Sequence, residues 1–383
     1  MKTCITLLSV LLLLALNHPL CSAQEGDENG RAVQMGAAWK GDMAHSLSGG
    51  LRQGSVFLGM ATFSVSLDTE SAGLWKNGLF AASAARTLGA MPSAELFGDA
   101  QVTSNIEAGN HTFLMELWIR QRFGSTEITA GLQDMNAIFA ISESGGLFLN
   151  SSFGIMPVIT GNVPAPVFPL TSPGVTVVAE TGRYGSFAAA LFDGRPVPFE
   201  NNPFNTRWKF ASGDGVLAIA EYRHRTEVRG FAGEYKAGLF SHNHLIGEFL
   251  GHELPDTLCS PTIGLYVLAD QTFWQTENRK ASFFMQAGYT PSRESYIDLA
   301  AAFGVNITGL IRNRMNDVAG LALTAGRFSG GAGSETSIEI TYRVHFSENI
   351  FLQPDLQYII HPSGSSSGIP HCLAGFLRLG VSL

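Results

Sequence analysis

The clearest hydrophobic pattern in this chain is a strict alternation of apolar and polar residues. Over residues 338–346 one face of the segment is apolar, and the other carries charged and hydroxyl side chains. The apolar set is Ile338, Ile340, Tyr342, Val344 and Phe346, and the polar set is Glu339, Thr341, Arg343 and His345. A repeat of two residues is that of a β-strand with two different faces. We therefore predict a strand here, with its faces assigned by this alternation.

The same alternation recurs along the rest of the chain. It is found in residues 57–68, 113–123, 231–240 and 373–383. In the second of these segments, Phe113, Met115, Leu117 and Ile119 oppose Glu116, Trp118, Arg120 and Arg122. We count roughly 14–16 such segments between Gln34 and Leu383. No helical heptads, fixed repeat or interdomain linker interrupt them, which favours one domain.

The length of these segments separates two kinds of β protein. Strands of a soluble sandwich usually have about five or six residues. Many segments here run to about 9–11 residues or more, the length that a tilted strand needs to cross a bilayer. Aromatic residues near the segment ends are candidates for the girdles of a membrane barrel: Phe123, Phe240, Tyr289, Phe346 and Tyr358. We predict an all-β fold, a transmembrane antiparallel β-barrel of about 16 strands. On this reading Ile338, Tyr342 and Val344 face lipid, and Glu339, Thr341 and Arg343 face the lumen.

Composition agrees with an apolar, exported chain. Only 15% of the 383 residues are charged, whereas ordinary soluble domains have about 25%. The net charge of −8 argues against a nucleic-acid partner. Lys2, the apolar run Leu7–Leu16 and the small residues before Ala23 have the pattern of a secretory signal peptide. We therefore expect residues 1–23 to be removed and residues 24–383 to form a single outer-membrane barrel domain.

Motifs for enzymatic chemistry find little support. Residues 364–368 match G-x-S-x-G, but no helical pattern follows, as a nucleophile elbow requires. His242, His244 and His252 offer three imidazoles for a metal, although a polar loop between two strands is the favoured interpretation. Cys259 and Cys372 remain after processing and are able to pair in an oxidising compartment. We predict a protein that is not an enzyme and that has no cofactor and no metal site.

One polar face stands out from the others. Glu116, Trp118, Arg120 and Arg122 place an acid, an indole and two guanidinium groups on the same side of one strand. Carboxylate and guanidinium groups form paired hydrogen bonds, and an indole stacks on the apolar face of a sugar ring. The alternative is a structural network in which these charges satisfy one another across the barrel. The residues alone leave both interpretations open.

Seven stretches, in order along the chain, resemble the carbohydrate-selective porin family, the OprB-type outer-membrane sugar porins. They are Gly98–Ala108, Glu116–Phe123, Ala130–Gly154, Ser172–Val175, Phe192–Pro196, Gly264–Trp274 and Leu352–Gly364. The resemblance implies a barrel of 16 strands in a Gram-negative outer membrane that passes small sugars by facilitated diffusion. It also implies that the proline-rich stretch after Phe153 is a long loop that narrows the pore. Arg120 stands where the family often has an acidic residue.

The hypothesis from sequence is therefore an outer-membrane porin for carbohydrates. The expected pore-constriction residues are Glu116, Trp118, Arg120, Arg122, Gln133, Asp134, Asn136, Glu143 and Asn150. Its expected partners are carbohydrates, outer-membrane lipid and lipopolysaccharide, with no nucleic acid, in a monomer or a homotrimer. The alternatives are a general diffusion porin without a sugar site, an outer-membrane barrel enzyme and a secreted lectin.

Overall fold

The chain folds into a closed ring of antiparallel strands. The computed structural model describes residues 31–208, 210, 213–243, 261–291 and 295–383. These residues hold sixteen strands: β1 (Val33–Ser48), β2 (Gly54–Asp68), β3 (Gly78–Gly89), β4 (Thr112–Phe123), β5 (Thr126–Gln133), β6 (Ser172–Glu180), β7 (Gly185–Asp193), β8 (Val216–Val228), β9 (Phe231–His242), β10 (Thr262–Thr276), β11 (Arg279–Tyr289), β12 (Ile297–Thr308), β13 (Val318–Phe328), β14 (Gly333–Ser347), β15 (Ile350–Ile360) and β16 (Cys372–Ser382). The predicted fold class and strand number are confirmed.

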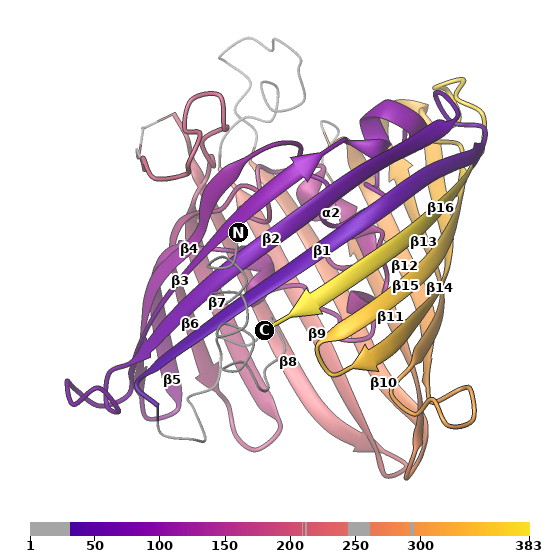
Figure 1. Ribbon diagram of the computed structural model, residues 1–383. Coiled ribbons are helices and arrows are strands. Elements are labelled where there is room, and N and C mark those ends of the chain that lie inside the picture. Colours follow the sequence, from indigo (N-terminus) through magenta and orange to yellow (C-terminus); the bar gives the residue numbers. More distant parts are fainter. Residues whose placement is uncertain (1–30, 209, 211–212, 244–260, 292–294) are drawn as a thin grey trace, which may run out of the picture.

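Each strand pairs with its neighbours in sequence, and the first strand closes on the last (Figure 1). The β1–β16 seam runs from Ala38 opposite Ser382 to Ser48 opposite Leu373. Closure leaves no strand edge with unpaired N–H and C=O groups, which is one of the two ways in which a backbone can cross hydrocarbon.

The faces of the strands follow the predicted alternation. On β14, Ile340 points outward with 56% of its surface exposed, while Glu339 on the opposite face is fully buried. Ile338 is likewise exposed, and Thr341 is buried inside the barrel. The outer wall is thus covered with apolar side chains, whose exposure to water would be unfavourable but which suit a lipid environment.

Predictions about faces are wrong at two places, on β4 for Phe113 and Met115 and on β9 for Phe240. A bulge at Met115 shifts the register between β3 and β4, because Ser83 pairs with Glu116 and the next residue, Ala84, pairs with Leu114. Phe113 therefore points inward and packs on Phe199, whereas the alternation placed it outside. Phe240 is also not a girdle residue, because it is fully buried on the inner face of β9. Four predicted girdle aromatics do lie exposed: Phe123, Tyr289, Phe346 and Tyr358.

The two ends of the barrel differ. At one end, strands are joined by tight turns such as Gly124-Ser125 and Arg229-Gly230. Arg229 and Gly230 have φ of 55° and 81°, and a type I′ two-residue hairpin turn requires positive φ at both positions. At the other end, drawn uppermost in Figure 1, long loops include residues 90–111, 134–171 and 194–215.

Two of these loops fold into the barrel rather than away from it. We call residues 134–171 the inner loop and residues 90–111 the second loop. Their short helices are η1 (Ser93–Phe97) in the second loop, and η2 (Met135–Ala137), η3 (Gly145–Leu147), η4 (Ser151–Phe153) and α2 (Pro157–Thr160) in the inner loop. A further turn, η5 (Ser329–Gly331), joins β13 to β14. No helix of the described residues is long and apolar enough to cross a membrane.

The core of the molecule lies between these loops and the inner wall. Phe139, Val158 and Ile159 of the inner loop are fully buried against inward residues of β7–β10, such as Ile219 and Phe240. The second loop packs Leu96 and Phe97 against β1, β2, β15 and β16. The proline-rich stretch is therefore a loop inside the barrel, as the family resemblance implies.

Candidate functional site

The inner loop is fastened to the wall by carboxylates that accept hydrogen bonds from its backbone. Glu339 of β14 accepts from the N–H groups of Leu149 and Asn150, at 2.6 and 3.0 Å. On the opposite side, Glu221 of β8 accepts from the N–H of Ala140 at 2.8 Å. Backbone groups buried without partners would cost free energy, so these carboxylates let an irregular segment lie inside a barrel.

Cations of the inner wall bind the carbonyl groups of the same loop. Lys236 of β9 donates to the Ile141 carbonyl at 2.7 Å. Arg343 of β14 donates to the Leu147 carbonyl at 3.2 Å, and Arg223 of β8 donates to the Ile138 carbonyl. The lumen charges of β8, β9 and β14 thus act as a scaffold for the loop.

The second loop is held at the seam where the barrel closes. Arg378 of β16 and Asp42 of β1 form a bidentate ion pair at 2.7 and 2.8 Å, and both side chains are buried. Ser104 donates to Asp42 at 2.7 Å, and Asn105 accepts from Arg378 at 2.8 Å. The two loops also join each other, because the Asn105 N–H donates to the Leu149 carbonyl at 2.8 Å. Together they form one body that covers the inner wall from β7 round to β2, and Phe168 of the inner loop also packs on Ala85 of β3 and Phe113 of β4.

The polar face of β4 lies beside the start of the inner loop, where Glu116 accepts a hydrogen bond from the Asp134 backbone. Glu116 accepts hydrogen bonds from Ser83 at 3.1 Å and from the Trp118 indole N–H at 3.3 Å. The Arg120 guanidinium carbon lies 5.6 Å from the centre of the Trp118 ring. Acid, indole and guanidinium therefore form one contiguous row along the inner side of the strand, as the alternation predicts.

Glu127 of β5 completes this row and was not predicted from the sequence. It lies opposite Arg122 across the tight turn, accepts from its Nε at 2.7 Å and pairs with Arg120 at 3.6 Å. The Arg122 side chain is 60% exposed, in contrast to the buried cations of the scaffold. The sequence does contain a signal for this position, the two-residue turn Gly124-Ser125, because such a turn fixes the pairing of the residues on either side of it.

The inner loop begins beside this row. Asp134 accepts from the N–H groups of Asn136 at 2.8 Å and Phe168 at 3.3 Å, which caps η2. Burial raises the pKa of Asp134 to about 7, with a smaller contribution from the nearby Glu116 carboxylate. The structure therefore brings Asp134 to Glu116, as the predicted site requires. Its charge changes within the physiological pH range.

Three other predicted residues serve the backbone. Gln133 donates to the Gly174 carbonyl at 2.8 Å and accepts from Thr176, which fixes it within the wall. Asn136 donates to the carbonyls of Phe139 and Gly154 inside the inner loop. Asn150 is buried against β15, where it donates to Gln357 at 3.3 Å. These side chains shape the loop and the wall.

Glu143 lies apart from the row on β4. It is exposed on the inner loop, next to Ser144, whose N–H donates to Asp270 of β10 at 3.0 Å. The nine predicted positions therefore fall into two regions. Glu116, Trp118, Arg120, Arg122 and Asp134 are grouped, with Gln133 and Asn136 near Asp134 in the chain, while Glu143 and Asn150 lie toward β10 and β15.

The histidine and cysteine candidates show no assembled site. His242 is buried at the end of β9, with Nε2 at 2.8 Å from the Gly194 carbonyl oxygen. His244 and His252 lie outside the described residues, and so does Cys259, the potential partner of the buried Cys372. Within the part of the chain that the structure describes, no group of three His, Cys, Asp or Glu residues is placed to hold a metal ion.

Comparison with known proteins decides the family. Residues 52–383 match the model of the carbohydrate-selective porin, OprB family. The chain belongs to this family. As an OprB-family protein it is an outer-membrane porin for carbohydrates, and the predicted function is confirmed at this level. None of the curated proteins matches the sequence.

Solved structures support the barrel fold. The high-pH structure of Pseudomonas putida OprB superposes with a TM-score of 0.81 at 17% identity, over 92% of this chain and 94% of that chain. Its low-pH structure gives a TM-score of 0.59 at 16% identity, over 92% and 93%. Salmonella typhi OmpF in complex with daunomycin gives 0.58 at 10% identity, over 94% and 100%. In such barrels the short turns face the periplasm and the long loops face the outside.

Proposed function

We propose that sugars cross this OprB-family barrel along the inner face of β4, between Trp118 and the start of the inner loop. The carrying observation is the contiguous row Glu116–Trp118–Arg120 on the inner face of β4, beside the start of the inner loop. Hydroxyl groups of a sugar replace their lost hydration by hydrogen bonds to the carboxylate and the guanidinium. The indole supplies a flat apolar surface for the sugar ring.

The arrangement suits transport rather than retention. Arg120 approaches the Trp118 ring and also pairs with Glu127 at 3.6 Å, so its guanidinium has a partner when no sugar is present. A sugar must compete with these contacts, which keeps its binding weak. Conduction requires this balance, because a site that binds tightly does not release its ligand. Passage through such a pore needs no covalent chemistry, and we propose no enzymatic role.

Sugar block of single-channel current tests the proposal. Trp118→Ala removes the stacking surface, which is worth on the order of 1 kcal/mol, and should weaken sugar block about fivefold in an open, stable channel. Arg120→Ala should weaken the block and shift ion selectivity toward cations, because a positive charge leaves the pore. Trp274→Ala, at an exposed tryptophan near the turn end of β10, is the matched control and should change neither property. Unchanged block in both β4 variants would leave a general diffusion porin.

We also propose how the chain reaches and occupies its membrane. Residues 1–23 lie outside the described residues, and their removal as a signal peptide would leave residues 24–383 as one barrel domain. The apolar outer wall would contact outer-membrane lipid and lipopolysaccharide, in a monomer or a homotrimer. Mass spectrometry of the mature N-terminus tests the cleavage site after Ala23, and native mass spectrometry in detergent distinguishes the two assembly states.

A further inference from the structure

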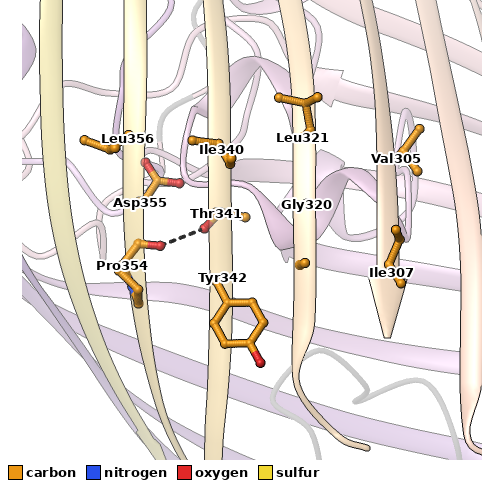
Figure 2. Close-up of a pocket in the computed structure, with 11 residues that line it drawn as sticks. Val305, Ile307, Gly320, Leu321, Ile340, Thr341, Tyr342, Pro354, Asp355 and Leu356 are labelled. Carbon is orange, nitrogen blue, oxygen red and sulfur yellow. Dashed lines mark hydrogen bonds between the residues drawn. The ribbon is translucent and has the colours of Figure 1, made fainter. Parts of the chain in front are cut away.

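The outer wall carries a hollow in the region of β12–β15. It has a volume of about 560 Å³ and is lined almost entirely by apolar groups. Leu321, Ile340 and Leu356 line it and are all strongly exposed outward-facing residues, so the hollow opens on the outer surface and not on the lumen. The remaining lining includes Val305, Ile307, Tyr342 and Pro354 (Figure 2). Ala319 also lines the hollow.

A proline within a strand creates part of this hollow. Pro354 lies inside β15 and has no N–H to donate to the ladder. Strands β14 and β15 pair at Thr341–Asp355 and again at Val344–Leu352, but not at the two positions between them. The Thr341 hydroxyl donates to the Pro354 carbonyl at 3.4 Å across this break (Figure 2). The hollow is therefore built into the register of the wall.

The base of the hollow is supported from behind by the inner loop. Gly320 of β13 lies at its base, and Leu147 and Phe148 of the inner loop press on the other side of that residue. A Cβ at position 320 would lie 2.7 Å from Leu147 Cδ2, so the barrel wall and the inner loop are in close contact there. The inner loop thus supports the wall from within, and the hollow has a fixed depth.

The chemistry changes at the periplasmic end of the hollow. Tyr342 directs its hydroxyl to Asp317 at 2.8 Å, and Asp317 is already paired with Arg314 at 2.8 Å. The turn 309–317 joins β12 to β13 directly beyond the hollow, and on it Arg312 is exposed. The hollow, which we call the groove from here on, therefore ends at a turn that carries two arginines. One buried carboxylate on this turn, that of Asp317, is paired with Arg314.

We propose that this groove binds one acyl chain of a phospholipid of the periplasmic leaflet, with the phosphate beside Arg312 and Arg314. The inference rests on the proposed contact of the wall with outer-membrane lipid but not on the sugar row. An apolar chain with an anionic group at one end matches an apolar groove with a cationic turn at one end. Lipopolysaccharide occupies the leaflet at the opposite, long-loop end, so its chains do not meet this turn.

Native mass spectrometry of the full barrel, titrated in detergent with phosphatidylglycerol, tests the site. Wild type should retain one phosphatidylglycerol per chain. Ala319→Phe fills the groove and should lower that occupancy at least tenfold, and Arg312→Ala should lower it about threefold. Ala237→Phe is the matched control, because Ala237 is an exposed alanine on β9 and its replacement should leave occupancy at the wild-type level.

Two outcomes would overturn the site. Equal lipid occupancy in wild type and Ala319→Phe would show that the groove binds no lipid. Loss of an oligomer in Ala319→Phe, without loss of lipid, would assign the groove to an interface between two copies of this chain. Sugar-blocked current, measured on the same variants, reports the β4 row separately, so failure of the lipid site and failure of the sugar pathway remain distinguishable.

Discussion

The inner faces of β4 and β14 both carry an acid followed four residues later by an arginine, but the two faces have different roles. On β14, Glu339 is fully buried and binds two backbone N–H groups of the inner loop. On β4, Trp118 and Arg120 remain partly accessible, and Arg122 is largely exposed. Charge in a lumen therefore does not by itself mark a pathway. Burial and the identity of the hydrogen-bond partner separate scaffold from pore.

The largest effect should come from the seam, where a scaffold charge has no access to water. Asp42→Ala leaves Arg378 buried without its carboxylate, which costs about 3–5 kcal/mol. Glu127→Ala on the pore side leaves two arginines with access to solvent and should cost about 1 kcal/mol or less. Urea unfolding in detergent compares the two. Equal losses in the free energy of unfolding would contradict the distinction between the scaffold and the pore side.

The outer and inner sides of one wall should also differ. Ile340→Arg places a charge on the lipid-facing side of β14 and should cost about 2–4 kcal/mol, with impaired assembly. Thr62→Arg places the same charge on the inner side of β2, where Thr62 is half-buried opposite the inward Ala85, and should assemble and change mainly the conductance. Heat-modifiable gel mobility of membrane fractions measures assembly. Normal assembly of Ile340→Arg would contradict the assigned face.

One substitution made in both regions sharpens the comparison directly. Glu339→Gln keeps the shape but leaves one acceptor oxygen for two N–H donors, so one donor goes unsatisfied at about 1–3 kcal/mol. We expect lower thermal stability and a larger open-channel conductance as the inner loop loosens. Glu116→Gln should instead weaken sugar block at unchanged stability. Thermal unfolding and single-channel recording separate these two results.

The smallest effect should be a pH dependence at the start of the inner loop. Because the pKa of Asp134 is raised to about 7, its carboxyl is mostly ionised at pH 8 and mostly protonated at pH 6. Cation selectivity, measured as the reversal potential in a salt gradient, should fall as the pH is lowered between these values. Asp134→Asn should show the low-pH selectivity throughout. If the cation selectivity of Asp134→Asn still fell between pH 8 and pH 6, the titrating group would lie elsewhere.

Much of the wall was predictable because the alternation of side chains along a strand depends on that strand alone. The alternation around Ile340 assigned the faces of β14 correctly, since side chains of a strand alternate whatever lies beyond it. The bulge at Met115 broke the same rule for Phe113, because an extra residue in one strand is not encoded in that strand's own periodicity. Phe240 was misplaced because a loop distant in sequence covers it.

The candidate site was predictable only in part. The row on β4 followed from alternation and from the family resemblance. The roles of Gln133, Asn136 and Asn150 did not, because an amide that holds a backbone and one that contacts a solute look alike in sequence. The same holds for Glu339, whose part in fastening the inner loop depends on contacts with Leu149 and Asn150, far away along the chain.

The Asp42–Arg378 pair has a consequence for the order of events during biogenesis. The two residues are 336 positions apart, so the carboxylate of the first strand meets its arginine only when nearly the whole chain has been delivered. Contacts of such sequence separation form late. Since Ser104 and Asn105 join the same pair, the second loop reaches its final anchorage only when the ring shuts. Closure of the ring and final anchorage of the second loop are therefore coupled in one step.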